Sequence, residues 1–330
     1  MSKILSISVA SYNVEKFIEK TILSFTDSEV IDKIELLIVD DGSKDSTAEI
    51  VKGYQEKYPD SVKYIYQDNA GPGSTVNNGF KHATGKYFRM VDGDDWVDTH
   101  NLKQYIEFLE NNEVDVVYTD YSLVDNDSME TVPQKLNYKN NNVLLKYDDV
   151  CSGLEVSMHN VTYLTSVLNE IDFKIDNCFY TDMEYLLYPV KNLKTIAVLD
   201  LNIYMYRVSL STQSMNINSM IRNKKMHELV FTHIFNDFIE HMNDFSNEQK
   251  KFVRKKLLTM AGAHLSIIIA QKPCSETKKE LKEFIKFLGK DKELLNSFLE
   301  LKTVKLIVKS NYLLFNSISK MHRKKTGVID

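Results

Sequence analysis

Short apolar runs alternate with stretches of helical periodicity over the first 120 residues, and this alternation constrains the fold most strongly. Continuous apolar runs such as Leu36–Val39 are typical of strands buried in a parallel sheet. Between them, apolar residues recur every three or four positions, as from Val14 to Phe25. We predict strands at 4–10, 36–39, 62–66, 86–91 and 114–119, and helices at 14–25, 46–58, 73–83 and 99–111. This order predicts an α/β fold, a mostly parallel sheet with helices on both faces.

The pattern changes along the 330-residue chain. Residues 121–218 are less regular and are interpreted as mixed α/β structure that completes a site. Beyond Ser219, amphipathic helices are predicted at 224–245, 246–270, 275–289 and 291–316. Charge divides in the same way, with a net −15 over 1–218 and +10 over 219–330. We therefore expect two domains, 1–218 and 219–330, the second all-helical.

Composition excludes several classes of protein. A hydrophobic fraction of 43% is ordinary for a globular chain. The three cysteines are odd in number and widely spaced, which argues against a disulfide framework and favours a reducing compartment. Lys3–Ala10 is too short an apolar stretch for a signal peptide core or a membrane span. The expected location is cytoplasmic, with peripheral attachment at the inner face of the cell membrane as an option.

The strongest chemical motif is Val91-Asp-Gly-Asp-Asp-Trp96, at the end of a predicted strand. Ligands of open α/β sheets bind beyond the carboxyl ends of the strands. Carboxylates this close repel one another unless a cation neutralises them, and Mg²⁺ or Mn²⁺ prefers such oxygen ligands. Asp92, Asp94 and Asp95 are therefore candidate metal ligands. The alternative is an Asp-rich turn that caps the next helix.

Two further loops follow predicted strands. Asp41, in Val39-Asp-Asp-Gly-Ser43, is a candidate acceptor for a base N–H group, or else part of a simple strand-to-helix turn. Ser46-Thr-Ala-Glu49 next to it has the pattern of a capping box. The loop 67–75, which contains Asn69, is Gly-rich and precedes a helix whose N-terminus could hold an anion, or it is a plain turn.

Two later stretches add candidate residues. Tyr180-Thr-Asp-Met-Glu184 offers Asp182 and Glu184 as general bases, although a solvated helix start is also consistent with it. Met205–Ser214 contains Arg207, which could pair with phosphate oxygens or form a surface ion pair. His227-Glu228 begins an HExxH pattern, but Phe231 replaces the second histidine, so no zinc site is expected.

Taken in order, these residues resemble the family 2 glycosyltransferases with a GT-A fold. Ser8–Asn13 is similar to the first strand of that family, Val39–Ser43 to its nucleotide-binding turn, and Asp92-Gly-Asp94 to its D-x-D motif. The resemblance implies that Ala10 and Tyr12 line the nucleoside pocket. It also implies that Asp41 binds the base and that Asn69 belongs to the family's third loop. By the same resemblance, Asp92 would bind the ribose or the metal, Asp94 the metal, and Asp182 would remove the acceptor proton.

The resemblance also implies an activity. It predicts inverting transfer of a single sugar from a nucleotide diphosphate sugar, with a UDP-sugar as the favoured donor and with Mn²⁺ or Mg²⁺. The implied acceptors are glycans, glycolipids or glycoproteins of the kind found in bacterial capsule and polysaccharide synthesis. No Q-x-x-R-W motif of processive members is present. His159 lies where the family builds its acceptor side, or it is a core histidine. The alternatives are a nucleotidyltransferase and a non-catalytic scaffold on a transferase fold.

The basic C-terminal half suggests a partner for the predicted helices. Lys320, Arg323, Lys324 and Lys325 follow the apolar residues Leu313–Phe315, a pattern that favours an anionic membrane surface. The apolar stripes of the helices equally favour a homo-oligomer. Aromatic residues there have core spacing, so no nucleic-acid partner is expected.

Overall fold

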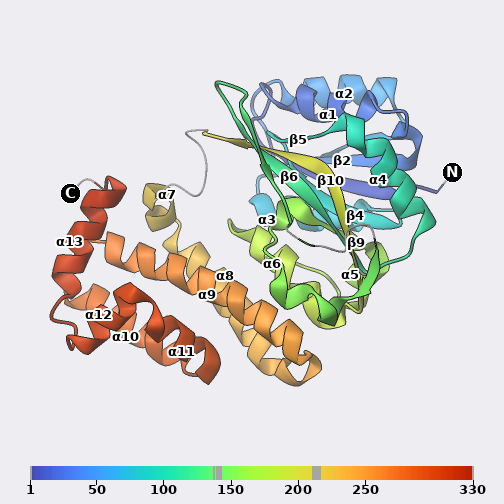
Figure 1. The fold of residues 1–330 in the computed structure, drawn as a ribbon. Coiled ribbons are helices and arrows are strands. Elements are labelled where there is room, and N and C mark those ends of the chain that lie inside the picture. Colours follow the sequence, from blue (N-terminus) through green and yellow to red (C-terminus); the bar gives the residue numbers. More distant parts are fainter. Residues whose placement is uncertain (1, 137, 139–142, 210–216, 329–330) are drawn as a thin grey trace. The chain divides into compact units, whose positions relative to one another are not determined.

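The computed structural model describes residues 2–328 except 137, 139–142 and 210–216 (Figure 1). The chain divides into two compact units, Met1–Ser211 and Thr212–Asp330. Their boundary falls within the undescribed stretch 210–216, seven residues before the boundary expected from the sequence.

The first unit is built on a ten-stranded sheet with the order β3-β2-β1-β4-β9-β6-β10-β5, with β7 paired to β6 and β8 to β10. The strands are β1 (Leu5–Ser11), β2 (Ile34–Asp40), β3 (Val62–Tyr66), β4 (Tyr87–Asp92), β5 (Trp96–Val97), β6 (Val116–Asp125), β7 (Thr131–Gln134), β8 (Leu144–Lys146), β9 (Val161–Leu164) and β10 (Thr195–Val208).

The sheet has a parallel half and a mixed half. Strands β3, β2, β1 and β4 are parallel, as the β-α alternation predicts, and β2 is buried along its whole length. Strand β9 lies between β4 and β6 and is antiparallel to both. The α/β class is confirmed, and the sheet is more mixed than the sequence indicated because short return strands from 131–164 enter it.

Helices cover the sheet (Figure 1), four of them where helices were predicted and two, α5 and α6, in the stretch 121–218 that was expected to be mixed α/β. They are α1 (Ile18–Thr26), α2 (Thr47–Lys57), α3 (Pro72–His82), α4 (Thr99–Asn111), α5 (Thr165–Glu170) and α6 (Thr181–Leu187). The predicted capping box at Ser46 and Glu49 is wrong, because the Ser46 side chain makes no cap hydrogen bond. The carboxylate of Asp45 accepts from Thr47 N instead, at 3.1 Å.

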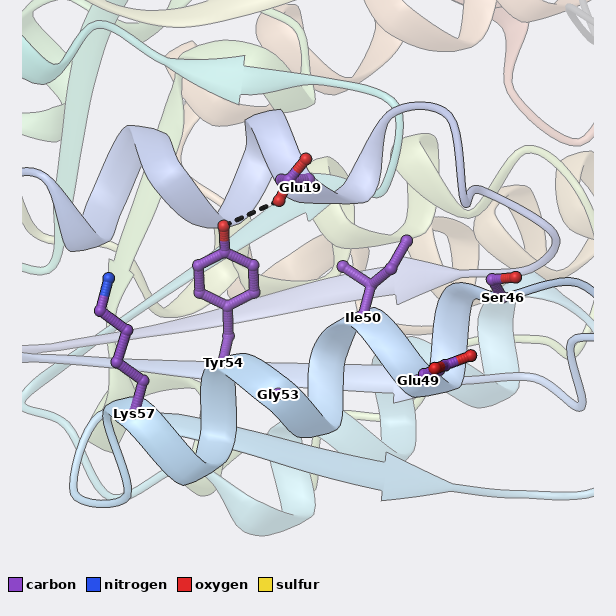
Figure 2. A pocket seen from close by; sticks show the side chains of 7 residues that line it. All are labelled: Glu19, Ser46, Glu49, Ile50, Gly53, Tyr54 and Lys57. Atoms are coloured by element: carbon purple, nitrogen blue, oxygen red, sulfur yellow. Dashed lines mark hydrogen bonds between the residues drawn. The ribbon is translucent and has the colours of Figure 1, made fainter.

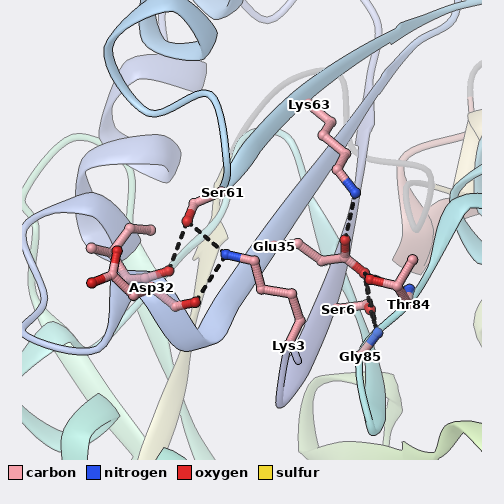
Figure 3. A network of polar contacts seen from close by, with 9 residues as sticks. Lys3, Ser6, Asp32, Glu35, Ser61, Lys63, Thr84 and Gly85 are labelled. Carbon is pink, nitrogen blue, oxygen red and sulfur yellow. Dashed lines mark hydrogen bonds and ion pairs between the residues drawn. The ribbon is translucent and has the colours of Figure 1, made fainter. Parts of the chain in front are cut away.

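A buried carboxylate fixes the starts of the parallel strands (Figure 3). Glu35 is fully buried and accepts hydrogen bonds from Ser6 Oγ at 2.5 Å, Thr84 N at 2.5 Å and Lys63 Nζ at 2.7 Å. Burial alone would raise the pKa of Glu35, but these donors hold it below the ordinary value. The network joins β1, β2, β3 and the approach to β4 at the amino ends of these strands. The carboxyl ends are therefore left for ligands.

The second unit is helical throughout its described elements. They are α7 (Ile217–Arg222), α8 (Lys224–Glu240), α9 (Asn247–Ala270), α10 (Ser275–Leu288), α11 (Lys292–Glu300), α12 (Lys302–Lys309) and α13 (Phe315–Thr326). Helix α9 contacts α7, α8, α10, α11 and α13, so it is the centre of the unit. Its start is a true capping box, in which Ser246 Oγ accepts from Gln249 N and the Gln249 side chain accepts from Ser246 N.

The single helix expected at 291–316 is wrong, because this stretch forms α11, α12 and the start of α13. Leu301 leaves the helical conformation, with ψ 126°, and ends α11. Asn311 and Tyr312, with φ values of 46° and 63°, separate α12 from α13. Among the described residues, no helix is both long enough and apolar enough to cross a bilayer.

Candidate active site

The acidic turn after β4 is fixed by hydrogen bonds to other elements. Asp92 is the last residue of β4, and Asp94 and Asp95 lie in the turn before β5. The Asp95 carboxylate is buried and accepts from Tyr204 Oη at 2.6 Å and from Arg207 N at 2.7 Å. A Cβ at Gly93 would meet the carbonyl oxygen of Ala10 at 2.7 Å, so the turn requires glycine there. The turn is therefore tied to β1 and β10.

Asp94 and Asp182 both act electrostatically on Asp92. The pKa of Asp92 rises to about 7, chiefly because of burial and further because of the negative charges of Asp94 and Asp182. Burial also raises the pKa of Asp94, against the opposing effect of Arg207. Asp182 is 90 residues from Asp92 in the chain, so the fold brings together two motifs that the sequence could only name separately. A partly buried group of like charges suits a divalent cation.

Asp182 stands in the first turn of α6, and Tyr180 before it has a left-handed backbone with φ 72°. Burial raises the pKa of Asp182, although its own N–H and that of Met183 lower it. Glu184, the other candidate base, is buried and accepts from Asp176 N at 2.9 Å and Tyr188 Oη at 2.7 Å. Glu184 therefore has structural partners, whereas Asp182 lies beside the acidic turn.

The Gly-rich loop serves packing as well as turning. A Cβ at Gly73 would meet the carbonyl oxygen of Asp176 at 1.7 Å, so the start of α3 lies directly against the segment that leads into α6. Asn77 strengthens this contact, because its side chain donates to Ile175 O at 2.8 Å and accepts from Ile175 N at 2.9 Å. Helix α3 thereby helps to position Asp182.

Asp41 holds the loop that contains Asn69. Its carboxylate accepts from Gln67 Nε2 at 2.7 Å, Ala70 N at 2.9 Å and Gly71 N at 3.0 Å. Asn69 Nδ2 donates to the main-chain oxygen of Asp41 at 3.0 Å. Three donors of the chain thus occupy the carboxylate that the sequence assigned to a base, and only its remaining lone-pair capacity is available to a ligand.

Ala10 and Tyr12 lie at the end of β1, between the two acidic turns. Ala10 is in register with Val39 on one side and with Asp92 on the other. Tyr12 is 50% exposed, which leaves its ring available for stacking. The main chain around it is held because Asn13 N donates to Ser43 Oγ at 2.9 Å.

Arg207 is 6% exposed, which rules out the surface ion pair considered for it. Its guanidinium lies 4.7 Å from the centroid of the Phe17 ring and 4.8 Å from that of Trp96. Its Nε donates to Asp94 O at 2.8 Å, and its Nη1 donates to Asn126 Oδ1 at 3.2 Å. Arg207 therefore supports the acidic turn. Residues 210–214 of the same motif lie outside the described residues.

Aromatic residues of β10 complete the site, and the sequence analysis did not single them out. The rings of His159 and Tyr206 stack with centroids 4.2 Å apart, and Tyr204 meets the His159 ring edge-on at 4.8 Å. Ligand atoms of His159, Asp92 and Asp95 lie within 4.8 Å of one another. Burial, with the nearby Arg89, lowers the pKa of His159 to about 3, so the ring is neutral. The two-residue spacing of Tyr204 and Tyr206 in a strand was the available signal.

A hollow of about 560 Å³ between α1 and α2 is a separate feature (Figure 2). It is lined by Glu19, Ser46, Glu49, Ile50, Gly53, Tyr54 and Lys57. Tyr54 Oη donates to Glu19 across it at 3.0 Å. It contains none of the candidate catalytic, metal or donor-binding residues, so it is not part of the candidate active site.

Comparison with known proteins assigns the chain to a family. Residues 6–172 match the family model described as Glycosyl transferase family 2, so the chain belongs to that family. It is 30% identical over 218 residues to the uncharacterized glycosyltransferase EpsJ of Bacillus subtilis, a match that covers 63% of this chain and 62% of EpsJ. It is 33% identical over 115 residues to the minor teichoic acid biosynthesis protein GgaB of Bacillus subtilis, over 34% of this chain and 13% of GgaB.

Solved structures show the same fold. The structure of S. aureus TarS 1-349 in complex with UDP matches with a TM-score of 0.66 and 21% identity, over 98% of this chain and 92% of TarS 1-349. A complex of the same protein with UDP-GlcNAc matches with a TM-score of 0.67. The expected GT-A fold with a helical C-terminal region is confirmed. The curated relatives reported above are matched over less than two thirds of their own lengths.

Proposed function

We propose that this protein is an inverting, metal-dependent glycosyltransferase that transfers one sugar from a UDP-sugar to a glycan, glycolipid or glycoprotein acceptor. The proposal is supported by the position of the D-x-D motif at the carboxyl end of β4, together with Asp182, whose negative charge helps to raise the pKa of Asp92. Such a site needs a base, a cation and a donor-binding face at the end of the parallel strands.

The donor set fits Mn²⁺ or Mg²⁺. Asp92 and Asp94 supply carboxylate oxygens, the ligand type that these ions prefer, and burial leaves their negative charge poorly solvated. Asp95 was also predicted as a ligand, but both of its oxygens already accept protein hydrogen bonds. We therefore assign the direct ligand role to Asp94 first and Asp92 second, with Asp95 as support. A bound ion would neutralise charge on the diphosphate leaving group.

Asp182 would accept the proton of the acceptor hydroxyl as its oxygen attacks the anomeric carbon. The bond between that carbon and the diphosphate oxygen breaks in the same displacement, so the configuration inverts. Burial raises the pKa of Asp182, which makes its carboxylate a better base than one in water.

The donor would lie across the ends of β1, β2 and β4. Tyr12 offers an exposed ring beside Ala10, and Asp41 with Asn69 shapes the loop on the nucleoside side. Arg207 would act on the phosphates through the turn that it supports. Choice of a UDP-sugar draws on the UDP and UDP-GlcNAc complexes of the structural neighbour, which is related at the level of fold.

The acceptor class and the cellular setting are inferred from relatives and from charge. GgaB is described as a teichoic acid biosynthesis protein, which favours a bacterial cell-surface or capsule-type polysaccharide as acceptor. We further propose that residues 1–218 form the catalytic domain and 219–330 a docking domain for a membrane or a second copy. The protein would then act in the cytoplasm or at the inner face of the membrane.

A thermal-shift and donor-hydrolysis series tests the proposal. We expect UDP and UDP-sugars with Mn²⁺ to raise the melting temperature more than GDP does, because a ligand stabilises the state that binds it. Slow metal-dependent release of UDP would distinguish an enzyme from a scaffold on the same fold. Asp94→Ala serves as the matched control, and UDP release that persists in excess EDTA would contradict metal dependence.

A further inference from the structure

The last two helices carry a surface on which lysines and exposed apolar side chains are interleaved. Residues 301–328 contain no Asp or Glu. Their basic residues are Lys302, Lys305, Lys309, Lys320, Arg323, Lys324 and Lys325. The same stretch exposes large apolar side chains, namely Leu306 (47%), Val308 (37%), Leu313 (82%), Leu314 (45%) and Met321 (68%). We refer to the outer faces of α12 and α13 with the turn between them as the basic–apolar surface.

Helical spacing places each set of residues on its own face. Helix α12 buries Val304 and Ile307, while Lys302, Leu306 and Lys309 recur at helical spacing on the opposite side. The inner face of the helix is therefore used for packing, and the outer face combines one leucine with two lysines.

Helix α13 repeats the pattern. It buries Phe315, Ser319 and Arg323, which are four residues apart, and exposes Lys320, Met321 and Lys324 on the other side. Arg323 Nη1 donates to Ala270 O at 2.8 Å, so this arginine packs against the end of α9. The sequence pattern groups Arg323 with the lysines that favour a membrane surface, but its burial removes it from that set.

The turn between the helices exposes the most apolar position. Asn311 and Tyr312 have positive φ values, which reverse the chain and leave Leu313 82% exposed. In the part of the chain that the structure describes, Lys320 and Lys324 have no ion-pair partner, whereas Lys305 is paired with Glu300. Exposed apolar residues beside unpaired lysines are typical of a surface that binds a protein partner or a membrane.

We propose that the basic–apolar surface docks this protein on an anionic lipid membrane. Leu313, Leu314 and Met321 would enter the boundary between headgroups and acyl chains, and the lysines would extend their stems so that the ammonium groups reach the phosphates. A second copy of the chain is disfavoured as the occupant, because a two-fold interface would place two surfaces without acidic residues against each other. The inference does not depend on the donor or the acceptor of the reaction.

Flotation of the full chain with lipid vesicles tests the proposal. We expect binding to phosphatidylcholine vesicles that contain phosphatidylglycerol, no binding to phosphatidylcholine alone, and weaker binding as salt rises. Lys320→Gln with Lys324→Gln should lower the partition coefficient roughly 30-fold, because each lysine near an anionic leaflet strengthens binding by about fivefold. Leu313→Ser with Met321→Ser should lower it at every salt concentration.

Matched variants elsewhere in the helical unit separate this surface from a general charge effect. Lys272→Gln with Lys286→Gln removes the same charge from exposed positions outside α12 and α13, and Met226→Ser with Leu229→Ser removes exposed apolar groups of α8. Both should bind vesicles like the unchanged protein, and circular dichroism should show that all variants are folded. Equal binding to neutral and anionic vesicles, no binding to either, or a Leu313-dependent dimer in light scattering would overturn the proposal.

Discussion

The backbone N–H of Arg207 donates to Oδ1 of Asp95 at 2.7 Å, across 112 residues of chain. The side chain of the same arginine donates to the main-chain oxygen of Asp94 at 2.8 Å. Strand β10 therefore holds the acidic turn through two neighbouring residues of that turn. Asp95 thus binds β10 through its carboxylate, whereas Asp94 binds it through its main-chain oxygen, so the two aspartates have different roles.

We predict that Asp94→Ala abolishes activity while the melting temperature stays near that of the unchanged protein. The Asp94 side chain is the candidate metal ligand, and the hydrogen bond from Arg207 Nε goes to the main-chain oxygen of Asp94, which the substitution keeps. Sugar transfer and thermal melting measure the two effects. An active Asp94→Ala protein would show that the D-x-D aspartate is dispensable.

Asp95→Ala should behave in the opposite way, with a loss of stability as its first effect. The substitution leaves Tyr204 Oη and Arg207 N without their buried acceptor, a change that costs about 1–3 kcal/mol for each unsatisfied group. Denaturant unfolding followed by near-ultraviolet circular dichroism measures it. Unchanged stability would mean that the turn is held by other contacts.

Asp182→Asn should lower turnover by about 10²-fold or more, with UDP affinity retained, because a positioned base contributes about that factor. Glu184→Gln is the matched comparison in the same helix. We expect it to destabilise the protein through its bonds to Asp176 and Tyr188 and to change turnover less. If Glu184→Gln lost turnover and Asp182→Asn lost only stability, Glu184 would be the base.

Asp41→Ala should weaken UDP binding and reduce discrimination between uridine and other nucleotides. The substitution releases Ala70 N and Gly71 N and lets the loop with Asn69 shift, and it removes the acceptor predicted for the base. Calorimetry with UDP and GDP measures both effects. Asp60→Ala, at an exposed position away from this loop, should bind UDP normally. Unchanged UDP affinity in Asp41→Ala would rule out both roles.

The helical unit should lose stability as the pH falls below about 6.5. Burial lowers the pKa of His227 to about 4, and burial with the charges of His227 and Lys224 lowers that of His264 to about 3. The unfolded chain therefore binds more protons over this window, so stability is complete above the unfolded pKa and declines toward pH 4 by up to about 1.4 kcal/mol per pH unit for each histidine.

Denaturant titrations between pH 7.5 and 4.5 measure this slope. His264→Phe keeps a ring beside Phe284, whose centroid lies 4.5 Å from that of His264, and removes one titrating group. We expect a shallower dependence on pH in this variant. The same slope in both proteins would assign the effect to other groups.

The local sequence was sufficient to predict the parallel strands and most helices. Apolar runs such as Leu36–Val39 and the periodicity of Thr99–Asn111 depend on residues close in the chain, and the structure places both elements where they were expected. The D-x-D motif and the family resemblance likewise rest on residues that are adjacent in the sequence. The break within 291–316 was missed, because backbone angles at Leu301, Asn311 and Tyr312 decide it and no proline or glycine marks it.

The sequence by itself determined the α/β class, the acidic turn at the end of β4 and the candidates Asp41, Asp94 and Asp182. Only the tertiary structure decided which of these side chains are free to act. The carboxylates of Asp95 and Asp41 accept hydrogen bonds from donors far away in the chain. Arg207 lies between two aromatic rings. Asp182 acts on the pKa of Asp92, and the packing of α3 against the start of α6 helps to position it. The physical reason is that hydrogen bonds and burial across long separations depend on the packed fold, whereas periodicity and turn chemistry are local.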